Sequence, residues 1–254
     1  MTTHYETFST KEQDVCQAFE ESLRAKIATV DSPTTNPGFL SEHCTSLRNY
    51  LLQRRHLSQA YIPWVNTALC GLNHSRDTRG KEILRELIQD ETPEGLPTHA
   101  EDLVADLTTL GIPLETILGT LTHPDTEETV RKQHTLIQYS PQTSFNNLRI
   151  LVAVRTAGEL LPGAEYGIIT PLLEKLGLKK SRFYKPHWFH DRKTEGTNQQ
   201  GMTHTELFSS LLKELICSEK TLDTALTTLQ NAAAQRTEFI NVTFARYDIK
   251  LEKI

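Results

Sequence analysis

Apolar residues recur every three or four positions along most of the chain, and no long stretch alternates with a period of two. Leu207, Leu211 and Leu215 are one example. A spacing of three to four places side chains on one face of an α-helix, whereas a half-buried strand needs a period of two. We therefore predict an all-α protein, with eight or more helices in a single domain over residues 1–254.

Turn residues and capping patterns divide this helical chain. Thr98–Glu101 and Thr203–Glu206 have the threonine-x-x-glutamate pattern of a capping box, and Thr10 with Gln13 forms a weaker one. Gly111 is expected to end a helix. The predicted helices cover about residues 10–30, 39–56, 58–72 with a continuation at 83–88, 98–110, 113–121, 125–138, 144–161, 164–176, a segment around 187, a stretch from 203 and a last helix through 239–249.

Composition excludes several classes of protein. The net charge is -5 and the pI is about 6.1, without a basic stripe, so nucleic acid is not an expected partner. No apolar run reaches the length of a membrane span, and the first residues lack the pattern of a secretion signal, so we expect a cytoplasmic protein. The motifs of dinucleotide, P-loop, serine-hydrolase and zincin sites are missing.

The four cysteines lie far apart in the sequence and form no Cys-x-x-Cys pair. Cys16, Cys70 and Cys217 have apolar neighbours and are predicted to be small buried side chains. Cys44 is the fourth. This pattern predicts neither a zinc ribbon nor a disulfide framework, and it fits a reducing compartment.

His187 and Asp191 are four residues apart, so a helix would place them on one face, one turn from each other. Pro186 suits the first turn of such a helix, where a missing N–H leaves no bond unmade. His190 would point away from both and is the weaker ligand. A histidine and an aspartate at this spacing indicate either a metal site or a structural hydrogen bond.

Other polar residues stand at unusual places. Glu159 lies in the apolar run 151–161, where a carboxylate is rarely buried unless it is paired or binds a metal. Arg155, one turn earlier, could form an ion pair with it at the surface. His99 and His204 each follow a capping threonine, and each is either a surface histidine or a ligand. Glu91 lies in an acidic helix end in which Asp90 and Glu94 are alternatives.

The order Glu91, His99, Glu159 and then His187-x-x-x-Asp191 resembles the heme-oxygenase-like metal-oxidase superfamily, with its TenA/PqqC-like fold. That group includes the chlamydial protein that associates with death domains. The resemblance covers about residues 10–230. It departs at one point, because the family has a histidine three residues after the aspartate and this chain has Thr194. We expect His204 to serve as the sixth ligand instead.

The resemblance implies a heme-oxygenase-like helical bundle with two non-heme irons. Dioxygen would be the co-substrate, and the substrate a small organic acid of the fatty-acid or amino-acid type. Arg155, Lys185 and Arg192 are expected to pair with the substrate carboxylate, while Tyr166 and Tyr184 are candidates for a part in the chemistry. A homodimer is a possible assembly. A ferritin-like bundle is disfavoured because the chain has no Glu-x-x-His.

Three other functions are alternatives. A helical binding or signalling module with a degraded site would explain Thr194. A thiaminase-type hydrolase on the same fold would need a nucleophilic cysteine in the cavity. A true heme oxygenase would leave the acid and histidine set without a role.

Overall fold

A computed structural model describes residues 3–28, 45–72, 78–192 and 203–245, without the side chains of residues 45 and 190–192. Within these ranges the chain forms helices and connections and no strand, so the predicted all-α class is confirmed. The helices are α1 (His4–Ala28), α3 (Thr45–Leu72), α4 (Thr78–Glu91), α5 (His99–Thr109), α6 (Leu114–Gly119), α7 (Pro124–Ile137), α8 (Asn146–Val154), the π-helix η1 (Arg155–Leu160), α9 (Leu161–Lys175), α10 (Tyr184–Arg192), α11 (His204–Leu215) and α12 (Glu219–Ala245).

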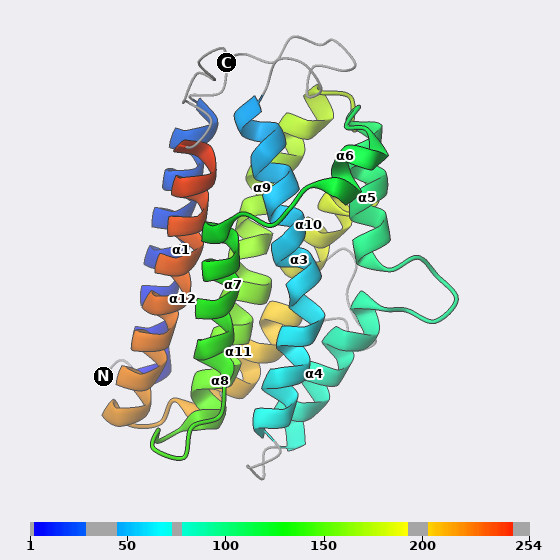
Figure 1. The fold of residues 1–254 in the computed structure, drawn as a ribbon. Coiled ribbons are helices and arrows are strands. Elements are labelled where there is room, and N and C mark those ends of the chain that lie inside the picture. The colour runs from blue at the N-terminus through cyan, green and yellow to red at the C-terminus, as the bar shows by residue number, and fades with distance from the viewer. Residues whose placement is uncertain (1–2, 29–44, 73–77, 193–202, 246–254) are drawn as a thin grey trace.

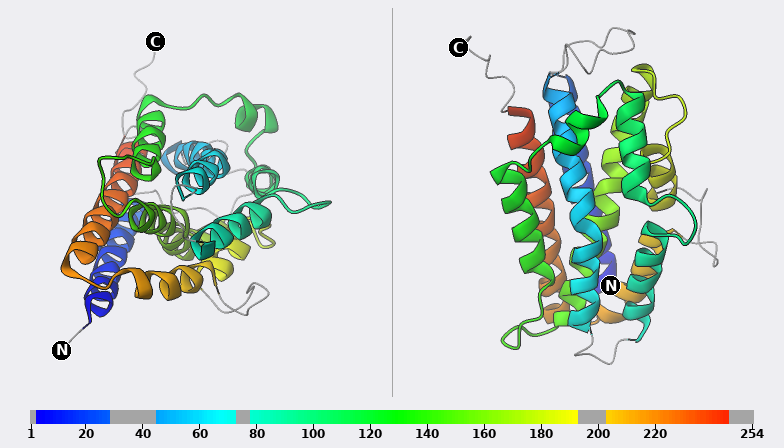
Figure 2. Two further views of the ribbon diagram at one scale, coloured as in Figure 1. Left: turned by 90° about the horizontal axis from the view of Figure 1, so that it is seen from below. Right: turned by 45° about the vertical axis from the view of Figure 1, so that its right-hand side comes forward.

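The long helices run side by side and form an elongated bundle (Figure 1). Helix α12 packs against α1, α3, α7 and α8, and α10 packs mainly against α9. Seen end-on, α1 lies beside α12, and α4 lies beside α11 (Figure 2). This packing surrounds α3 and the α8–η1–α9 segment with neighbours, which buries both apolar and selected polar side chains between the helices.

Two helices begin where the sequence predicts. Thr98 accepts a hydrogen bond from the backbone N–H of Glu101, and the Glu101 carboxylate accepts one from the backbone of Thr98. Thr203 and Glu206 make the same reciprocal pair at the start of α11. Both predicted capping boxes are therefore confirmed, and each fixes the residue that follows its threonine in the first turn of a helix.

The predicted start of the first helix is wrong. The capping residue is Thr3: its hydroxyl accepts from the Glu6 N–H at 3.1 Å, and its own N–H donates to Glu6 Oε2 at 2.6 Å. Thr10 lies inside α1, and its hydroxyl donates to the Glu6 carbonyl at 3.0 Å. A threonine in a helix can bond back to the preceding turn in this way, so its presence alone does not define a helix start.

Residues 45–72 form one continuous helix, α3, where the sequence predicted a break near Leu57. Ser58 is the predicted start of a new helix. Its hydroxyl instead accepts a hydrogen bond from Arg54 Nη1 at 2.7 Å, one turn earlier. The continuous helix carries Arg54, Ser58 and Tyr61 along one side, and these residues line the cavity described below.

A second predicted break, between residues 161 and 164, is also absent. Helices α8 and α9 are joined through η1, whose backbone is π-helical, and Pro162 lies in the first turn of α9. A single π-helical turn inside an α-helix is frequently found at functional sites. Here that turn carries Glu159, which is 3% exposed.

The interior is apolar, with large aromatic side chains such as Tyr50, Phe19 and Phe239 fully buried. Cys16 is buried as predicted, but Cys70 and Cys217 are exposed, so that part of the prediction is wrong. On α3 the buried face is formed by Val65, Ala68 and Leu72. Cys70 has apolar neighbours in the sequence, but it lies on the exposed side of α3. Cys44 lies outside the described residues.

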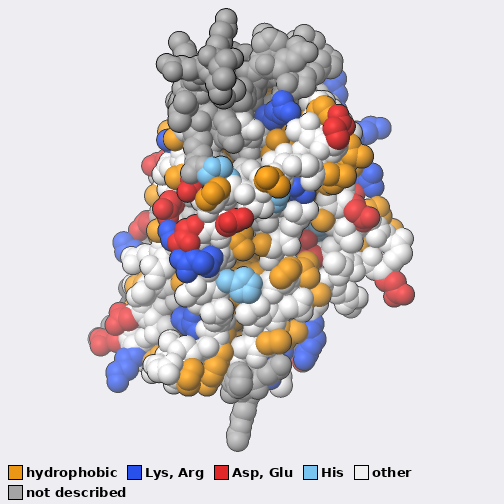
Figure 3. All heavy atoms as spheres, viewed as in Figure 1, with side chains coloured by type: hydrophobic (Ala, Val, Ile, Leu, Met, Phe, Trp, Pro, Cys, Tyr) orange, Lys and Arg blue, Asp and Glu red, His pale blue; other side chains and the backbone are white. Residues whose placement is uncertain are grey.

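The described surface in Figure 3 mixes acidic, basic and apolar side chains on the face shown, without a broad basic area. Among the described helices, none combines the length and the apolar character needed to cross a membrane.

Candidate metal centre

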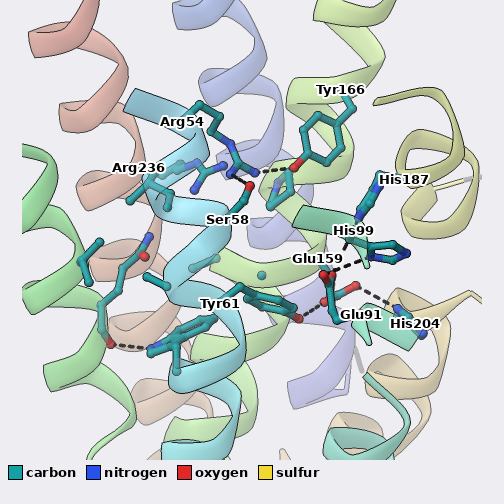
Figure 4. A pocket seen from close by; sticks show the side chains of 18 of the residues that line it. Arg54, Ser58, Tyr61, Glu91, His99, Glu159, Tyr166, His187, His204 and Arg236 are labelled. Carbon is teal, nitrogen blue, oxygen red and sulfur yellow. Dashed lines mark hydrogen bonds and ion pairs between the residues drawn. The ribbon is translucent and has the colours of Figure 1, made fainter. Parts of the chain in front are cut away.

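One cavity inside the bundle is lined by residues of nearly every helix around it. Its apolar walls include Leu57, Ala60, Trp64, Val130 and Pro162. The residues that the sequence singled out and that line this cavity are Glu91, His99, Glu159, Tyr166, His187 and His204. Figure 4 shows the side chains of Glu91, His99, Glu159, His187 and His204 close together, whereas the Tyr166 hydroxyl is directed at Arg54.

Helix ends bring most of these groups together. Glu91 is the last residue of α4, while His99 and His204 are the first residues of α5 and α11. His187 lies in the first half of α10, and Glu159 lies in the π-helical turn. The two capping boxes therefore fix the positions of His99 and His204, because each box sets where its helix begins.

Glu91 pairs with two histidines. Its Oε2 lies 3.0 Å from Nδ1 of His99, and its Oε1 lies 3.8 Å from Nε2 of His187. The two imidazole rings meet edge to face, with an interplanar angle of 67° and centroids 4.3 Å apart. Each of the three residues offers a ligand atom within 4.8 Å of those of the other two, which is the geometry of a potential metal site.

The orientation of His187 is set by Phe183, the residue just before α10. Nδ1 lies 2.7 Å from the backbone carbonyl oxygen of Phe183, so this nitrogen carries the proton and donates it. The other nitrogen, Nε2, is buried without a hydrogen-bond partner and faces Glu91. A histidine that ligates a metal commonly has its second nitrogen held in this way.

A second group surrounds Glu159. Its Oε2 lies 3.1 Å from Nδ1 of His204, and the Tyr61 hydroxyl donates a hydrogen bond to its other oxygen. Nε2 of His204 lies 2.8 Å from Oδ2 of Asp90. Glu86, Asp90 and His204 form another set whose ligand atoms lie within 4.8 Å of one another. Of this second group, Glu159 and His204 line the cavity, whereas Glu86 and Asp90 are not among its lining residues.

The carboxylates and imidazoles of the site shift one another's pKa values. Burial opposes ionisation of Glu91, but the imidazoles of His187 and His99 outweigh it and hold the Glu91 pKa well below its usual range. Burial lowers the pKa of His99, but Glu91 more than compensates and raises it. Burial likewise opposes ionisation of Glu159, yet His204 and Tyr61 lower its pKa. A divalent cation binds ionised carboxylates and neutral imidazoles. The lowered pKa values of Glu91 and Glu159 keep these carboxylates ionised, and a bound cation would displace the protons of the imidazoles beside them.

Several predicted residues lie elsewhere. Arg155 forms a buried ion pair with Glu12, and its Nη2 donates to Ser209 at 2.8 Å, so it does not line the cavity. Lys185 pairs with Glu174 at 3.0 Å. The structure therefore gives the expected substrate contacts of Arg155 and Lys185 no support.

Other predicted residues lie beside the cavity or outside the described atoms. Tyr184 is fully buried and packs on Tyr166, but it is not part of the cavity wall. The backbone of Asp191 and Arg192 belongs to α10, whereas their side chains lie outside the described atoms. Thr194 lies outside the described residues altogether.

The structure also shows cavity residues that sequence reasoning missed. Tyr61, Arg54 and Arg236 line the cavity, and no local pattern marks them. Glu86, which is not in the cavity wall, was missed as well; it lies four residues before Asp90 on α4, a spacing that could have marked one face of that helix. Of the alternatives to Glu91, Asp90 contacts His204, and Glu94 is exposed.

Comparison with known proteins gives a fold and nothing narrower. The chain matches no protein-family model, and no curated protein is similar to it at a significant level. A CADD-like protein of unknown function from Nostoc punctiforme has a similar structure, with a TM-score of 0.63, 12% identity and coverage of 93% of this chain and 98% of that one.

Two further structures are similar over nearly their whole length. A domain of unknown function with a heme oxygenase-like fold from Shewanella denitrificans has a TM-score of 0.62 and 16% identity, covering 95% of this chain and 93% of its own. A TenA family transcription regulator from a Silicibacter species has a TM-score of 0.59 and 13% identity, covering 95% and 96%.

These similarities establish the fold class. The protein is an all-α bundle with the heme-oxygenase-like fold that the TenA family and CADD-like structures share. Within this fold, the cavity wall carries Glu91, His99 and His187 together with the contacting pair Glu159 and His204.

Proposed function

We propose that this protein is a non-heme iron oxidoreductase that uses dioxygen to oxidise a small organic acid, of the fatty-acid or amino-acid type. One observation carries the proposal: five side chains of the kinds that bind iron line the same cavity. They come from α4, α5, η1, α10 and α11, far apart in the sequence. The five are Glu91, His99, Glu159, His187 and His204.

The donor set fits iron. Imidazole and carboxylate together are typical of non-heme iron sites, whereas sulfur ligands would favour zinc or iron–sulfur clusters. None of the described cysteines lines the cavity. Glu91, His99 and His187 would hold one iron, and His187 Nε2 is already buried, directed at Glu91 and without a hydrogen-bond partner.

Glu159 and His204 would hold the second iron. The direct contact between these two residues supports the idea that His204 replaces the histidine missing at Thr194. Asp90, which contacts the other nitrogen of His204, is available as a ligand or as an outer partner. Asp191 stays a predicted ligand, one turn after His187 on α10.

The chain's own residues prepare the site for this chemistry. Iron, when bound, would supply the reduction of dioxygen. The Phe183 carbonyl orients His187, and the Tyr61 hydroxyl orients Glu159. The walls formed by Leu57, Trp64 and Pro162, with their neighbours, hold the apolar part of a substrate and exclude water.

A helical binding or signalling module is the second candidate. Two observations favour it: the residue Thr194 at the histidine position of the family pattern, and the description of the Silicibacter neighbour as a transcription regulator. A thiaminase-type reaction receives no support, since none of the described cysteines lies in the cavity wall.

Metal stoichiometry separates the two candidates. The metal-free chain is loaded with ferrous iron without oxygen, desalted, and analysed for iron per chain. We expect about two irons per chain, the number for which the two groups provide ligands. His187→Ala should weaken iron binding by more than the roughly 10- to 100-fold typical of losing an outer partner. His4→Ala, which changes a histidine at the start of α1, is the control and should bind iron as the parent does.

His204→Ala tests the replaced ligand in the same assay. We expect it to retain about one iron per chain, because the Glu91, His99 and His187 group is left intact. A variant that binds iron as the parent does would remove His204 from the ligand set. If the parent itself binds no iron, the binding-module function is favoured.

A further inference from the structure

The cavity has a second polar region, apart from the metal-binding residues. Figure 4 shows Arg54, Ser58 and Arg236 together, across the cavity from Glu91, His99 and His204. Arg54 belongs to α3 and Arg236 to α12. Their exposed fractions are only 4% and 2%. A buried guanidinium is unfavourable unless charged and hydrogen-bonding partners compensate for its lost hydration.

One carboxylate pairs with both arginines. Glu165 is completely buried, and its Oε1 accepts from Arg54 Nε at 2.8 Å while its Oε2 accepts from Arg236 Nη2 at 2.5 Å. The Tyr50 hydroxyl also donates to Oε1. Two positive charges therefore face one negative charge, and this part of the cavity keeps a net charge of about +1.

Two buried donors at the cavity have no partner. Nε of Arg236 and the side-chain nitrogen of Gln133 are both buried without a hydrogen bond. Both residues line the cavity. By contrast, every nitrogen of Arg54 is engaged, by Glu165, by Ser58 at 2.7 Å and by the Tyr166 hydroxyl at 2.5 Å. An unmatched charge and two unmatched donors in one cavity are costly unless a ligand satisfies them.

We infer that this region is an anion subsite that binds the carboxylate of a small organic acid, with Arg236 as the principal contact and Gln133 as a second donor. A single carboxylate supplies the one negative charge and the acceptor oxygens that the region lacks. The Ser58 hydroxyl accepts from Arg54, which leaves its own proton to donate.

The subsite sets the direction of the bound acid. With the carboxylate at Arg236, the rest of the molecule would fill the cavity, whose apolar walls include Leu57, Ala60 and Ala157, in the direction of Glu91 and Glu159. The acid is thus held by the protein rather than by metal, and its far end approaches the metal-binding residues. That this acid is the substrate rests on the proposed function, whereas binding of the acid does not require iron.

Calorimetric titration of the full-length protein tests the subsite, with and without ferrous iron under nitrogen. The probes are hexanoate and hexanamide, which differ in charge but hardly in size. We expect hexanoate to bind at least about 10-fold more tightly than hexanamide in both states, because a hydrogen bond to a charged group is worth that much or more. Equal affinity for the two probes would overturn the inference.

Three variants locate the contact. Arg236→Gln should lose most of the preference for hexanoate, and Gln133→Leu, which keeps every charge, should lose about 3- to 10-fold in hexanoate affinity. Arg131→Gln, a change at an exposed arginine paired with Glu128, should match the parent. Circular dichroism establishes that each variant is folded. Parent-like hexanoate binding by both Arg236→Gln and Gln133→Leu would contradict the assignment.

The outcomes separate this inference from the proposed function. Hexanoate preference that depends on Arg236, in a protein that binds no iron, would support the subsite and remove the iron chemistry. Iron binding together with equal affinity for hexanoate and hexanamide would support the iron centre and overturn the anion subsite.

Discussion

At the residue scale, the site is built from pairs in which one group orients the other. His187 is fixed by a hydrogen bond to the backbone of Phe183, and Glu159 is fixed by Tyr61 from α3. Both arrangements leave a nitrogen or an oxygen directed at neighbouring ligand groups. Partners of this kind commonly hold a ligand in place before the metal binds.

Glu165 gives a prediction about pH. Burial opposes its ionisation, but the charges of Arg236 and Arg54 and the hydrogen bond from Tyr50 outweigh burial and lower the pKa of Glu165 below its ordinary value of 4.5. A carboxyl group whose pKa is lower in the folded state than in the unfolded state stabilises the fold at pH values above its unfolded-state pKa. This stabilisation is lost as the pH falls through the folded-state pKa. Glu165→Gln should therefore be destabilised most at neutral pH, by about 3 to 5 kcal/mol, because two buried arginines lose their partner.

Urea unfolding from about pH 7 to pH 3 measures this difference. The gap between parent and Glu165→Gln should narrow below the unfolded-state pKa, as the parent carboxylate takes up its proton. Glu174→Gln, at a half-exposed ion pair with Lys185, serves as the control and should change stability by less than about 1 kcal/mol. A gap that is the same at every pH would show that the charge of Glu165 is not the source of the stabilisation.

The sequence predicted some of these residues and missed others for a physical reason. His99 and His204 could be predicted because a capping box is a local pattern that fixes where a helix begins. Arg54, Glu165 and Arg236 could not, because their ion pairs join positions 111 and 71 residues apart. Nothing near an arginine in the sequence tells whether it is buried.

At the element scale, η1 and α3 fit closely at Gly158. A Cβ atom on Gly158 would lie 2.7 Å from Cε2 of Tyr61, which real contacts essentially never show. Gly158→Ala should push the Tyr61 ring away from Glu159, because the ring is the neighbour that must move. We expect a loss of about 1 to 3 kcal/mol in the free energy of unfolding, typical of overpacking, together with weaker iron binding.

Chemical denaturation and the iron assay measure both effects. Gly119→Ala is the matched control, because a Cβ there meets no atom within 4 Å. It should leave stability within about 0.5 kcal/mol of the parent and iron binding unchanged. Gly158→Ala with parent-like stability and iron content would show that contact between Tyr61 and η1 does not position Glu159.

Asp106 holds the start of α10. Its carboxylate accepts from the Ser181 hydroxyl at 2.6 Å and from the backbone N–H groups of Arg182 at 2.8 Å and Phe183 at 2.9 Å. Asp106→Ala would remove this cap and leave buried N–H groups without partners, so we expect a loss of at least about 2 kcal/mol in stability. Hydrogen exchange should accelerate in α10 more than in α12, since only the first depends on the cap.

The exposed Asp14 provides the comparison, because it pairs only with Lys11 on the surface in the described contacts. Asp14→Ala should change stability by no more than about 0.5 kcal/mol. If α10 of Asp106→Ala exchanged as slowly as in the parent, another contact would have to position His187.

Helix boundaries were the weakest part of the sequence prediction. The sequence predicts a helix start at Ser58 and a break between residues 161 and 164, yet both positions lie within continuous helical segments. A serine hydroxyl that finds a partner in the preceding turn no longer acts as a cap, as Arg54 and Ser58 show. Periodicity gave the helical class because it depends on many residues, whereas a boundary depends on one or two.

At the scale of the whole molecule, the site exists because the bundle brings several helix ends to one cavity. The order of Glu91, His99, Glu159 and His187 along the chain carried the resemblance to the heme-oxygenase-like superfamily. That these groups converge is a property of the fold, since the order of residues alone does not place them in space. The same packing brings Arg54 and Arg236 to the opposite part of the cavity.

The most direct test is a crystal structure of the protein grown with ferrous iron under nitrogen, with anomalous diffraction measured at the iron absorption edge. We predict one anomalous peak bonded to Glu91, His99 and His187, and a second beside Glu159 and His204. Crystals grown with ferrous iron that show no peak in this cavity, or peaks only on the outer surface, would contradict the proposal that the cavity is an iron centre.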